Sequence, residues 1–467
     1  MQPVQPAPLL LQDTLRTVRR RYRLPAMPTA SSRTQDDSPS ATLAIVLEQI
    51  RISLEAGETP DDALKYRFFD ALDCLIREAM QPARGDTAFQ AMVLRYQIAA
   101  VREYASLAAH ANQDRREVHA AVNTIAHPAK LQRMPSGALH AALTQLQAFA
   151  VAEDWNALSA CAEQVLPLAQ AEADSAVARG TDRLFGSPAL GRLQRLAVLV
   201  SDQQVQRYRS LWDQQGPRAG SAIAMEQGAA SQQRGAAVEA RAAQALEVLA
   251  QRLNAQPENR TPYRVVTSMR ASPSLPGNAD YAKSEWDAVL LQQVSSDGDA
   301  PAFDVCLLIE AKASVEAATT DLPRLLRGLR LLASAEADAT YVFDTHQGRM
   351  RLRGSSLKRF AGDDTHVAGS VLYCCDASAD AYPKLLSTAT RMQLLSAPGS
   401  VAYASGVADA ASGDRQSLAS VWEQLLTSAR WDTVRRQYPL LRQVRDLMVH
   451  VDDLFMAVNG QSGLGAA

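Results

Sequence analysis

Three residues able to do chemistry stand at the ends of two apolar segments of the chain. Asp287 follows Glu-Trp at the start of the first segment. The second segment, residues 303–309, is apolar almost throughout and ends in Glu310-Ala-Lys312. Isolated charges at the end of a buried strand are unfavourable unless they are paired or bound to a ligand. Their positions therefore make Asp287, Glu310 and Lys312 candidate site residues.

Strand geometry predicts that these side chains converge. Successive side chains of a strand point to opposite faces, so Glu310 and Lys312 share one face. If the two segments form a hairpin, Asp287 near the start of the first strand lies beside Glu310 near the end of the second. Two carboxylates and an amine would then meet at one point, which predicts a metal site with a base beside it.

Such a site fits the hydrolysis of a phosphodiester. The attacking and leaving oxygens both gain negative charge, and a divalent cation stabilises them and lowers the pKa of its bound water. Mg²⁺ prefers oxygen ligands, usually one or two carboxylates completed by water and phosphate oxygens. Asp287 and Glu310 would hold Mg²⁺ or Mn²⁺, with the Ala311 carbonyl as a third ligand. Lys312 would orient or deprotonate the attacking water, or stabilise the pentavalent phosphate.

The pattern of Asp287, 22 intervening residues and Glu-x-Lys resembles the motif of the PD-(D/E)XK nuclease superfamily. The resemblance covers roughly residues 232–375 and implies a restriction-endonuclease-like fold. It also implies that Glu239, on the helix before the first core strand, is an auxiliary catalytic residue and metal ligand. Trp286 stands where the family loosely keeps a proline. The alternative interpretation of the motif is a structural ion pair at a strand end.

Two arginine-rich segments downstream are candidate contacts for a nucleic acid. A helix predicted over residues 321–334 repeats arginine every third residue, and arginines alternate onto one face of a strand predicted near residue 350. They could bind phosphates in a salt-dependent, largely sequence-independent manner. The alternative for the strand is a solvated edge protected by its charges. His346 is expected to be a turn residue rather than a catalytic one. The candidate binding residues are Arg324, Arg327, Arg330, Arg349, Arg351 and Arg353.

The elements that must position these residues are predicted from residue 230 onward. Hydrophobic patterning predicts the order α-β-β-β-α-β-β, followed by a helical tail. This order predicts an α/β (α+β) domain with a mixed central sheet and flanking helices. The first helix is expected at 232–253, and the strands at 263–269, 285–294, 303–311, 340–344, 350–353 and 370–375.

The N-terminal part of the chain is predicted to be an α-helical bundle. Apolar residues recur there at three- and four-residue spacing among good helix formers. Single helices are expected over 42–54, 61–80, 87–109, 136–152, 155–178 and 190–215. The predicted domains are a disordered basic arm over 1–40, an α-helical domain over 41–220, a nuclease-like domain over 230–412, a C-terminal helical extension over 413–460 and a disordered tail over 461–467.

Composition excludes several other classes of protein. With 48 basic and 50 acidic residues, the chain does not bind nucleic acid by bulk positive charge, so any such site is a local patch. No segment approaches the roughly 18 apolar residues that span a bilayer, and no secretory signal begins the chain. The five cysteines contain no CxxC pair, which favours a reducing cytoplasm over a disulfide framework.

The sequence therefore predicts a divalent-metal-dependent nuclease, with DNA preferred because most members of the superfamily it resembles cut DNA. Defence, action as an exported toxin or effector, and repair stay open as its role. The helical region could bind a protein partner or self-associate. The amphipathic residues 438–458 are expected to pack on their own domain rather than to seal a dimer. The alternative function is a catalytically inactive nuclease-fold scaffold that binds nucleic acid or a protein partner through its helices.

Overall fold

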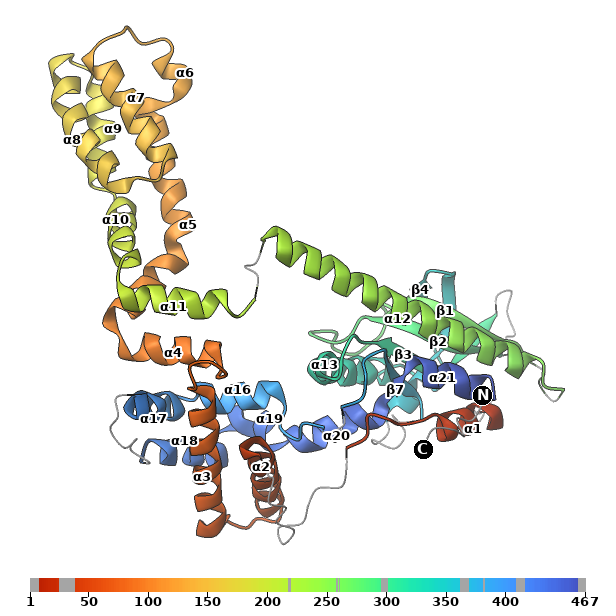
Figure 1. Cartoon of the computed structure of the whole chain (residues 1–467). Helices are drawn as coiled ribbons and strands as arrows, with labels where there is room; N and C mark the ends of the chain where they lie inside the picture. The colour runs from red at the N-terminus through yellow and green to blue at the C-terminus, as the bar shows by residue number, and fades with distance from the viewer. Residues whose placement is uncertain are drawn as a thin grey trace. The chain divides into compact units, whose positions relative to one another are not determined.

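The computed structural model describes residues 8–24, 38–216, 220–257, 259, 261–294, 301–361, 369–380, 383–408 and 416–460. The chain forms two compact units that alternate along the sequence (Figure 1). Unit 1 comprises Met1–Leu75, Arg218–Leu394 and Trp422–Ala467, and unit 2 comprises Ile76–Pro217 and Leu395–Val421. This division differs from the predicted domains, because residues 41–75 belong to unit 1 and residues 395–421 belong to unit 2. All of the candidate site residues lie in unit 1.

A mixed seven-stranded sheet forms the centre of unit 1 in the described part of the chain. Its strands are β1 (Tyr263–Arg270), β2 (Glu285–Val294), β3 (Ala302–Ala311), β4 (Thr340–Thr345), β5 (Gly348–Arg353), β6 (Val371–Cys375) and β7 (Met448–His450). The order is β2-β1-β4-β5-β3-β6-β7, and β2 also pairs with β3. Strands β1, β2 and β3 form an antiparallel meander, whereas β6 runs parallel to β3 and β7 parallel to β6. The expected mixed sheet is confirmed.

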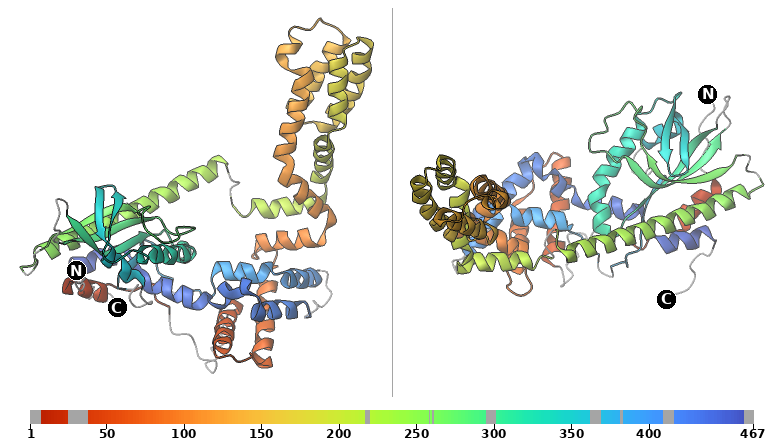
Figure 2. Two further views of the ribbon diagram at one scale, coloured as in Figure 1. Left: turned by 180° about the vertical axis from the view of Figure 1, so that it is seen from behind. Right: turned by 90° about the horizontal axis from the view of Figure 1, so that it is seen from above.

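Helices cover both faces of this sheet (Figure 2). One face is covered by α1 (Leu9–Thr17), α12 (Ala222–Asn254) and α21 (Val451–Val458), and the other by α13 (Val315–Ala333) and α20 (Gln437–Leu447). Because apolar cores lie on both faces, β3 is buried along almost its entire length. Burial on both faces of the sheet explains the long apolar run in the sequence before Glu310.

A β-bulge in β3 determines which face its last residues take. The register between β2 and β3 shifts between Leu290 and Leu291, which leaves Cys306 as an extra residue on β3. Beyond the bulge, Leu308 packs in the core on the α13 side of the sheet. Glu310 lies two residues further on and therefore takes the same side.

Helix α13 begins earlier in the chain than expected. Its first residue is Val315 rather than Asp321, because the Ser314 side chain accepts a hydrogen bond from the Ala317 N–H at 3.1 Å and caps the helix.

In the described part of the chain, the other helices wholly or partly in unit 1 are α2 (Pro39–Glu55), α3 (Asp62–Ala79), α14 (Gly354–Lys358), α16 (Thr388–Ser396), α18 (Gln416–Thr427) and α19 (Asp432–Arg435), with 3₁₀ turns at Arg359–Ala361 and Ala429–Trp431.

Residues 8–24 differ from the disordered arm expected over 1–40, and residues 1–7 and 25–37 lie outside the described residues. Residues 8–24 pack onto unit 1, where Leu11, Val18 and Tyr22 are buried. The Tyr22 hydroxyl donates to the carbonyl of Ala377, and Arg21 donates to the buried carboxylate of Asp453. Leucine and valine at helical spacing supply the apolar face that holds α1 on the sheet layer. The predicted tail at 461–467 lies outside the described residues.

The C-terminal helical extension expected over 413–460 is interrupted by a short strand. Helix α20 ends at Leu447, three residues extend the sheet as β7, and α21 follows. The His450 Nδ1 accepts a hydrogen bond from the Asp452 N–H at 3.2 Å and so caps α21. The segment packs within unit 1, as expected.

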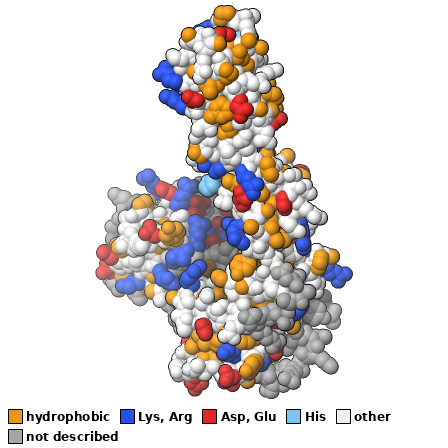
Figure 3. Space-filling view, turned by 90° about the vertical axis from the view of Figure 1, so that its left-hand side faces the viewer, with side chains coloured by type: hydrophobic (Ala, Val, Ile, Leu, Met, Phe, Trp, Pro, Cys, Tyr) orange, Lys and Arg blue, Asp and Glu red, His pale blue; other side chains and the backbone are white. Residues whose placement is uncertain are grey.

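Unit 2 is helical, which confirms the expected helical N-terminal region. Figure 3 shows acidic and basic side chains interspersed among apolar ones on one face of its upper part. None of the helices in the described ranges is both long enough and apolar enough to cross a bilayer. The helices of unit 2 are α4 (Thr87–Gln97), α5 (Ala99–Ala126), α6 (Pro128–Leu131), α7 (Ala138–Val151), α8 (Trp155–Ala171), α9 (Ser175–Phe185), α10 (Pro188–Val200), α11 (Gln203–Asp213) and α17 (Pro398–Ala408).

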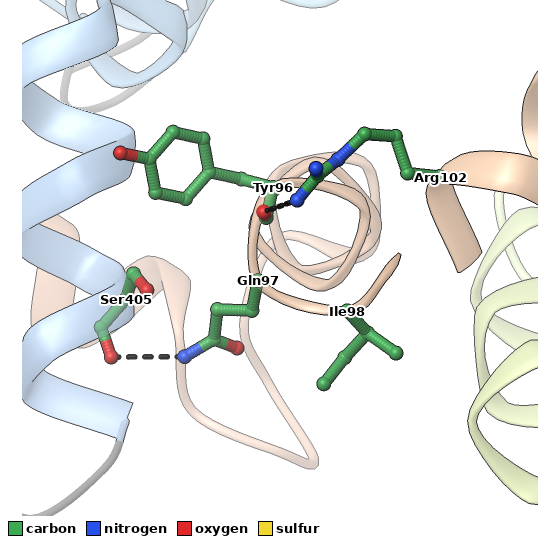
Figure 4. Close-up of a pocket in the computed structure, with 5 residues that line it drawn as sticks. All are labelled: Tyr96, Gln97, Ile98, Arg102 and Ser405. Atoms are coloured by element: carbon green, nitrogen blue, oxygen red, sulfur yellow. Dashed lines mark hydrogen bonds between the residues drawn. The ribbon is translucent and has the colours of Figure 1, made fainter. Parts of the chain in front are cut away.

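Three helices expected to be continuous are broken in unit 2. At the first break, Ile98 is extended and the Arg102 guanidinium donates to the Tyr96 carbonyl at 2.6 Å, which satisfies an exposed end of α4 (Figure 4). At the other two breaks, the side chains of Asp174 and Asp202 accept backbone N–H groups and start α9 and α11. N-terminal capping by aspartate outweighs the continuous apolar period at these positions.

Candidate active site

Asp287 and Glu310 lie side by side on β2 and β3. Ala288 pairs with Ile309, so Asp287 and Glu310 are the next positions along the two antiparallel strands. The Asp287 Oδ2 accepts a hydrogen bond from the Ala311 N–H at 2.7 Å, which directs this carboxylate toward the end of β3. The structure therefore brings together the two carboxylates that the sequence predicted to converge.

The backbone of β1 is distorted opposite Asp287. The ladder of β1 and β2 pairs Thr267 with Ala288 and Met269 with Trp286, and this register places Ser268 across from Asp287. Ser268 has a φ of 49°, and this left-handed conformation is energetically unfavourable for serine. Such strain concentrates at functional sites.

Glu310 is fully buried at this position. Burial first and the neighbouring Asp287 second raise its pKa to about 8, although Lys283 and Lys312 act in the opposite direction. Its Oε1 atom has no hydrogen-bond partner among the described residues. A buried carboxylate oxygen without a donor is unfavourable, so this atom is suited to a cation that enters from outside the chain.

Lys312 follows β3 and points to the same side as Glu310. Its backbone N–H donates to the Cys374 carbonyl at 2.8 Å and thus fixes the residue against β6. Its Nζ lies 3.6 Å from the Glu310 Oε2 and 3.2 Å from the Asp321 Oδ2. The amine is therefore held between two carboxylates at the edge of the buried site.

Asp321 on α13 also belongs to the site, although the sequence pattern predicted it only as the first residue of a helix. Its Oδ2 accepts a hydrogen bond from the Tyr373 hydroxyl at 3.2 Å in addition to its ion pair with Lys312. Tyr373 is buried on β6. Burial is the main cause that raises the pKa of its hydroxyl, and the Asp321 carboxylate raises this pKa further. Asp321 therefore contacts Lys312 directly, and Tyr373 holds the Asp321 carboxylate from the sheet side.

Lys283 is a second amine of the site that sequence reasoning missed. Its Nζ contacts the Glu310 Oε2 in an ion pair between side chains that are 8% and 0% exposed. Burial acts to lower the pKa of Lys283, but the carboxylates of Glu310, Asp287 and Asp321 outweigh burial and leave it raised. These carboxylates therefore favour the charged form of the Lys283 side chain.

The position of Lys283 depends on a close approach to α13. Its backbone N–H donates to the Arg324 carbonyl at 3.1 Å. A Cβ atom added to Gly328 would lie 2.9 Å from the Lys283 Cβ and 2.9 Å from the Lys283 carbonyl oxygen. Only glycine leaves room for this contact, but a glycine within a helix does not identify the residue that approaches it.

Glu239 of α12 lies at the border of the same site. It is half-buried, and it forms no hydrogen bond or ion pair with any residue that the structure describes. Burial first and Asp287 second raise its pKa, whereas His346 acts to lower it. His346 itself lies in the turn between β4 and β5, as expected for a turn residue. Its backbone N–H donates to the Thr267 carbonyl at 3.0 Å.

The candidate phosphate-binding arginines fall into two groups. Those of α13, Arg324, Arg327 and Arg330, are all exposed. On β5, Arg349 and Arg351 are exposed, but Arg353 donates through Nε to the buried Asp304 at 2.8 Å. Arg353 thus fills a structural ion pair, which corrects its assignment as a surface contact. Strand β5 also pairs with both β4 and β3, so it is not the free edge considered above.

The donor set fits a hard divalent cation. Asp287, Glu310 and Asp321 supply three carboxyl groups near the two ammonium groups of Lys283 and Lys312. Within the described ranges, no cluster of three or more His, Cys, Asp or Glu side chains has ligand geometry. Mg²⁺ is held in many sites by one or two carboxylates and is completed by water and phosphate oxygens, which matches the pair Asp287 and Glu310.

Comparisons of the chain with protein-family models, with curated proteins and with solved structures give no match. The resemblance to the PD-(D/E)XK nuclease superfamily therefore depends on the residues and contacts described above.

Proposed function

We propose that the chain is a divalent-metal-dependent nuclease that hydrolyses phosphodiester bonds, with DNA as the preferred substrate. The observation that carries this proposal is the meeting of Asp287, Glu310 and Lys312 at the end of two adjacent strands. The order of β1, β2, β3, α13 and β6, with β6 parallel to β3, supports a restriction-endonuclease-like arrangement of the sheet.

The buried carboxylates and the amines have separate tasks in this proposal. A bound Mg²⁺ or Mn²⁺ would supply Lewis-acid stabilisation of phosphate oxygens and a more acidic water. Asp287 and Glu310 would hold the cation, with the Ala311 carbonyl and Glu239 as additional ligands. Lys312 orients the attacking water or stabilises the charge that develops on the phosphate. Asp321 is a positioning residue, because it acts through Lys312.

The exposed arginines of α13 support a polyanionic substrate. Arg324, Arg327 and Arg330 project into solvent from the helix that carries Asp321 and contacts Lys283. Contacts between such arginines and phosphates position a nucleic acid without reading its sequence. Their contribution weakens as salt concentration rises.

The test is cleavage by the purified full-length chain. Supercoiled plasmid, linear duplex DNA, single-stranded DNA and RNA are incubated with Mg²⁺, Mn²⁺ or EDTA. We expect cleavage of DNA with either metal and none in EDTA. Asp287→Asn and Lys312→Ala should each abolish it, whereas the matched control Glu103→Gln, at an exposed ion pair of unit 2, should leave it unchanged. Circular dichroism and thermal unfolding show whether each variant is folded.

A second candidate function is a catalytically inactive scaffold that binds nucleic acid or a protein partner. The observation that favours it is the ion pair of Lys283 with Glu310, because an internal cation already compensates the buried carboxylate. A wild-type chain that binds DNA with equal affinity in Mg²⁺ and EDTA, and never cuts it, would support the scaffold and refute the enzyme. Cleavage that persists in Asp287→Asn would refute the assigned site.

A further inference from the structure

Tyr281 presents its ring to solvent from a strained backbone. It is 87% exposed, more than any other large apolar side chain in the part of the chain that the structure describes. Its φ is 54°, the left-handed region that glycine and asparagine adopt far more readily than tyrosine. At an exposed position with this strained backbone, an aromatic ring does not add to the stability of the fold. The ring is therefore suited to a contact with another molecule.

The segment that carries Tyr281 is held firmly against the fold. Residues 271–284 connect β1 to β2, and Leu275 and Ala282 from this segment are buried in the core that contains α13. The Ala282 N–H donates to the Ala279 carbonyl at 3.1 Å, and the Arg327 Nε donates to the Tyr281 carbonyl at 3.0 Å. The ring is therefore exposed on an anchored backbone, which lowers the entropic cost of binding through it.

Tyr281 also lies close to the candidate active site. Two residues after it, Lys283 contacts the Glu310 carboxylate, and two residues span at most about 7 Å between Cα atoms. Arg327, which holds the Tyr281 carbonyl, is one of the exposed arginines of α13. A polynucleotide bound at Glu310 with its phosphates on α13 would thus pass within reach of the ring.

We infer that Tyr281 is a stacking site for an unpaired nucleobase of the substrate. The inference rests on the proposed function and adds a preference for single-stranded or locally opened DNA. An aromatic ring can stack on any base, because each base has an apolar face. The neighbouring Asp280 is exposed and acidic, which disfavours a phosphate at this position and leaves the uncharged base as the partner.

The experiment measures the binding of the full-length chain carrying Asp287→Asn, so that DNA is bound but not cut. Fluorescence anisotropy compares a labelled single-stranded oligonucleotide, its duplex, and an abasic strand of the same length and charge. Tyr281→Ala is expected to weaken binding of the single strand by about 5- to 150-fold, the range that stacking of one base supplies. Tyr281→Trp and Tyr281→Phe should retain affinity, and the control Tyr66→Ala, at another exposed tyrosine, should not change it.

The abasic strand separates stacking from a structural effect. We expect Tyr281→Ala to bind the abasic and the normal strand equally well, and to lose the preference for single strand over duplex. Equal affinities of Tyr281→Ala and the parent for the normal strand would overturn the stacking inference and leave the nuclease proposal intact. A parent chain that binds neither DNA nor the corresponding RNA strands would overturn both.

Discussion

Lys283 and Glu310 form an ion pair in a part of the protein where both side chains are almost completely removed from solvent. Gly328 on α13 leaves room for the lysine at this position, and the glutamate lies near the end of β3. Each charge depends on the other, since an uncompensated buried charge is strongly unfavourable. The pair thereby links the segment before β2 to the centre of the sheet.

Substitution of one partner of this pair should destabilise the fold. Lys283→Met leaves Glu310 with only the more distant Lys312 as a cation and is expected to lower the free energy of unfolding by about 3–5 kcal/mol in EDTA. The double variant Lys283→Met/Glu310→Leu should recover most of the loss, because an apolar pair carries no charge. Urea unfolding measures both, with the exposed Lys358→Met as the control. A loss below about 1 kcal/mol would show that the pair is hydrated.

The raised pKa of Glu310 predicts a pH-dependent stability. Because its pKa is about 8 in the folded chain and 4.5 as the reference value, the folded state binds more protons than the unfolded state between these values. The contribution of Glu310 to stability is therefore fully present below about pH 4.5 and is lost as pH rises through about 8. We expect the difference in unfolding free energy between wild type and Glu310→Gln, measured in EDTA, to fall from pH 5 to pH 8.5. A difference that rises with pH would contradict the burial argument.

Metal binding should respond to pH in the opposite sense. A cation requires the deprotonated carboxylate of Glu310, so binding releases a proton and strengthens with rising pH. We expect the rise in melting temperature caused by Mg²⁺ to be larger at pH 8.5 than at pH 6, and to be absent in Asp287→Asn. An increase that is independent of pH and of Asp287 would place the cation elsewhere.

Gly328→Ala tests the close approach that positions Lys283. The added methyl group would meet the Lys283 backbone, and we expect a loss of about 1–3 kcal/mol in unfolding free energy together with slower cleavage. Gly235→Ala is the matched control, because Gly235 lies within α12 and its added Cβ meets no atom within 4 Å. That substitution should stabilise the chain by about 0.5–1 kcal/mol. Equal effects of the two substitutions would argue against the contact.

Removal of a buried N-terminal contact should destabilise unit 1. Arg21 pairs with Asp453, which is 1% exposed, whereas Arg16 pairs with Asp13 at a fully hydrated position. Arg21→Ala is expected to lower the unfolding free energy by about 3–5 kcal/mol, and Arg16→Ala by less than about 1 kcal/mol. Chemical denaturation of the two variants checks this difference. Similar values for both would indicate that the contact of Arg21 with Asp453 does not support the fold.

The strands that carry the candidate site could be predicted because their signals are local. Residues 285–294 and 303–311 are apolar runs bounded by charged or polar residues, and the structure has β2 at Glu285–Val294 and β3 at Ala302–Ala311. The neighbouring positions of Asp287 and Glu310 follow from the antiparallel register of a hairpin. Strand β7 could not be predicted, since three residues between two helical patterns carry no periodicity of their own.

The remaining members of the site could not be predicted because tertiary packing brings them together. Lys283 lies in a connecting segment and Asp321 on a helix, and neither has a spacing that relates it to Glu310 in the sequence. The burial of Tyr22 likewise depends on residues more than 300 positions away, such as Ala377. In such cases a charged or aromatic residue has the same local pattern whether it is solvated or buried.

Helices α1 and α21 complete the layer behind the site. Leu11 from α1 and Leu454 from α21 belong to the same apolar core as Ile309, the residue before Glu310. During synthesis on a ribosome, that core cannot close until α21 has emerged, although the strands bearing the acidic residues were made much earlier. Assembly of the layer behind Glu310 therefore requires α21, and we expect a polypeptide truncated before α21 to lack this layer.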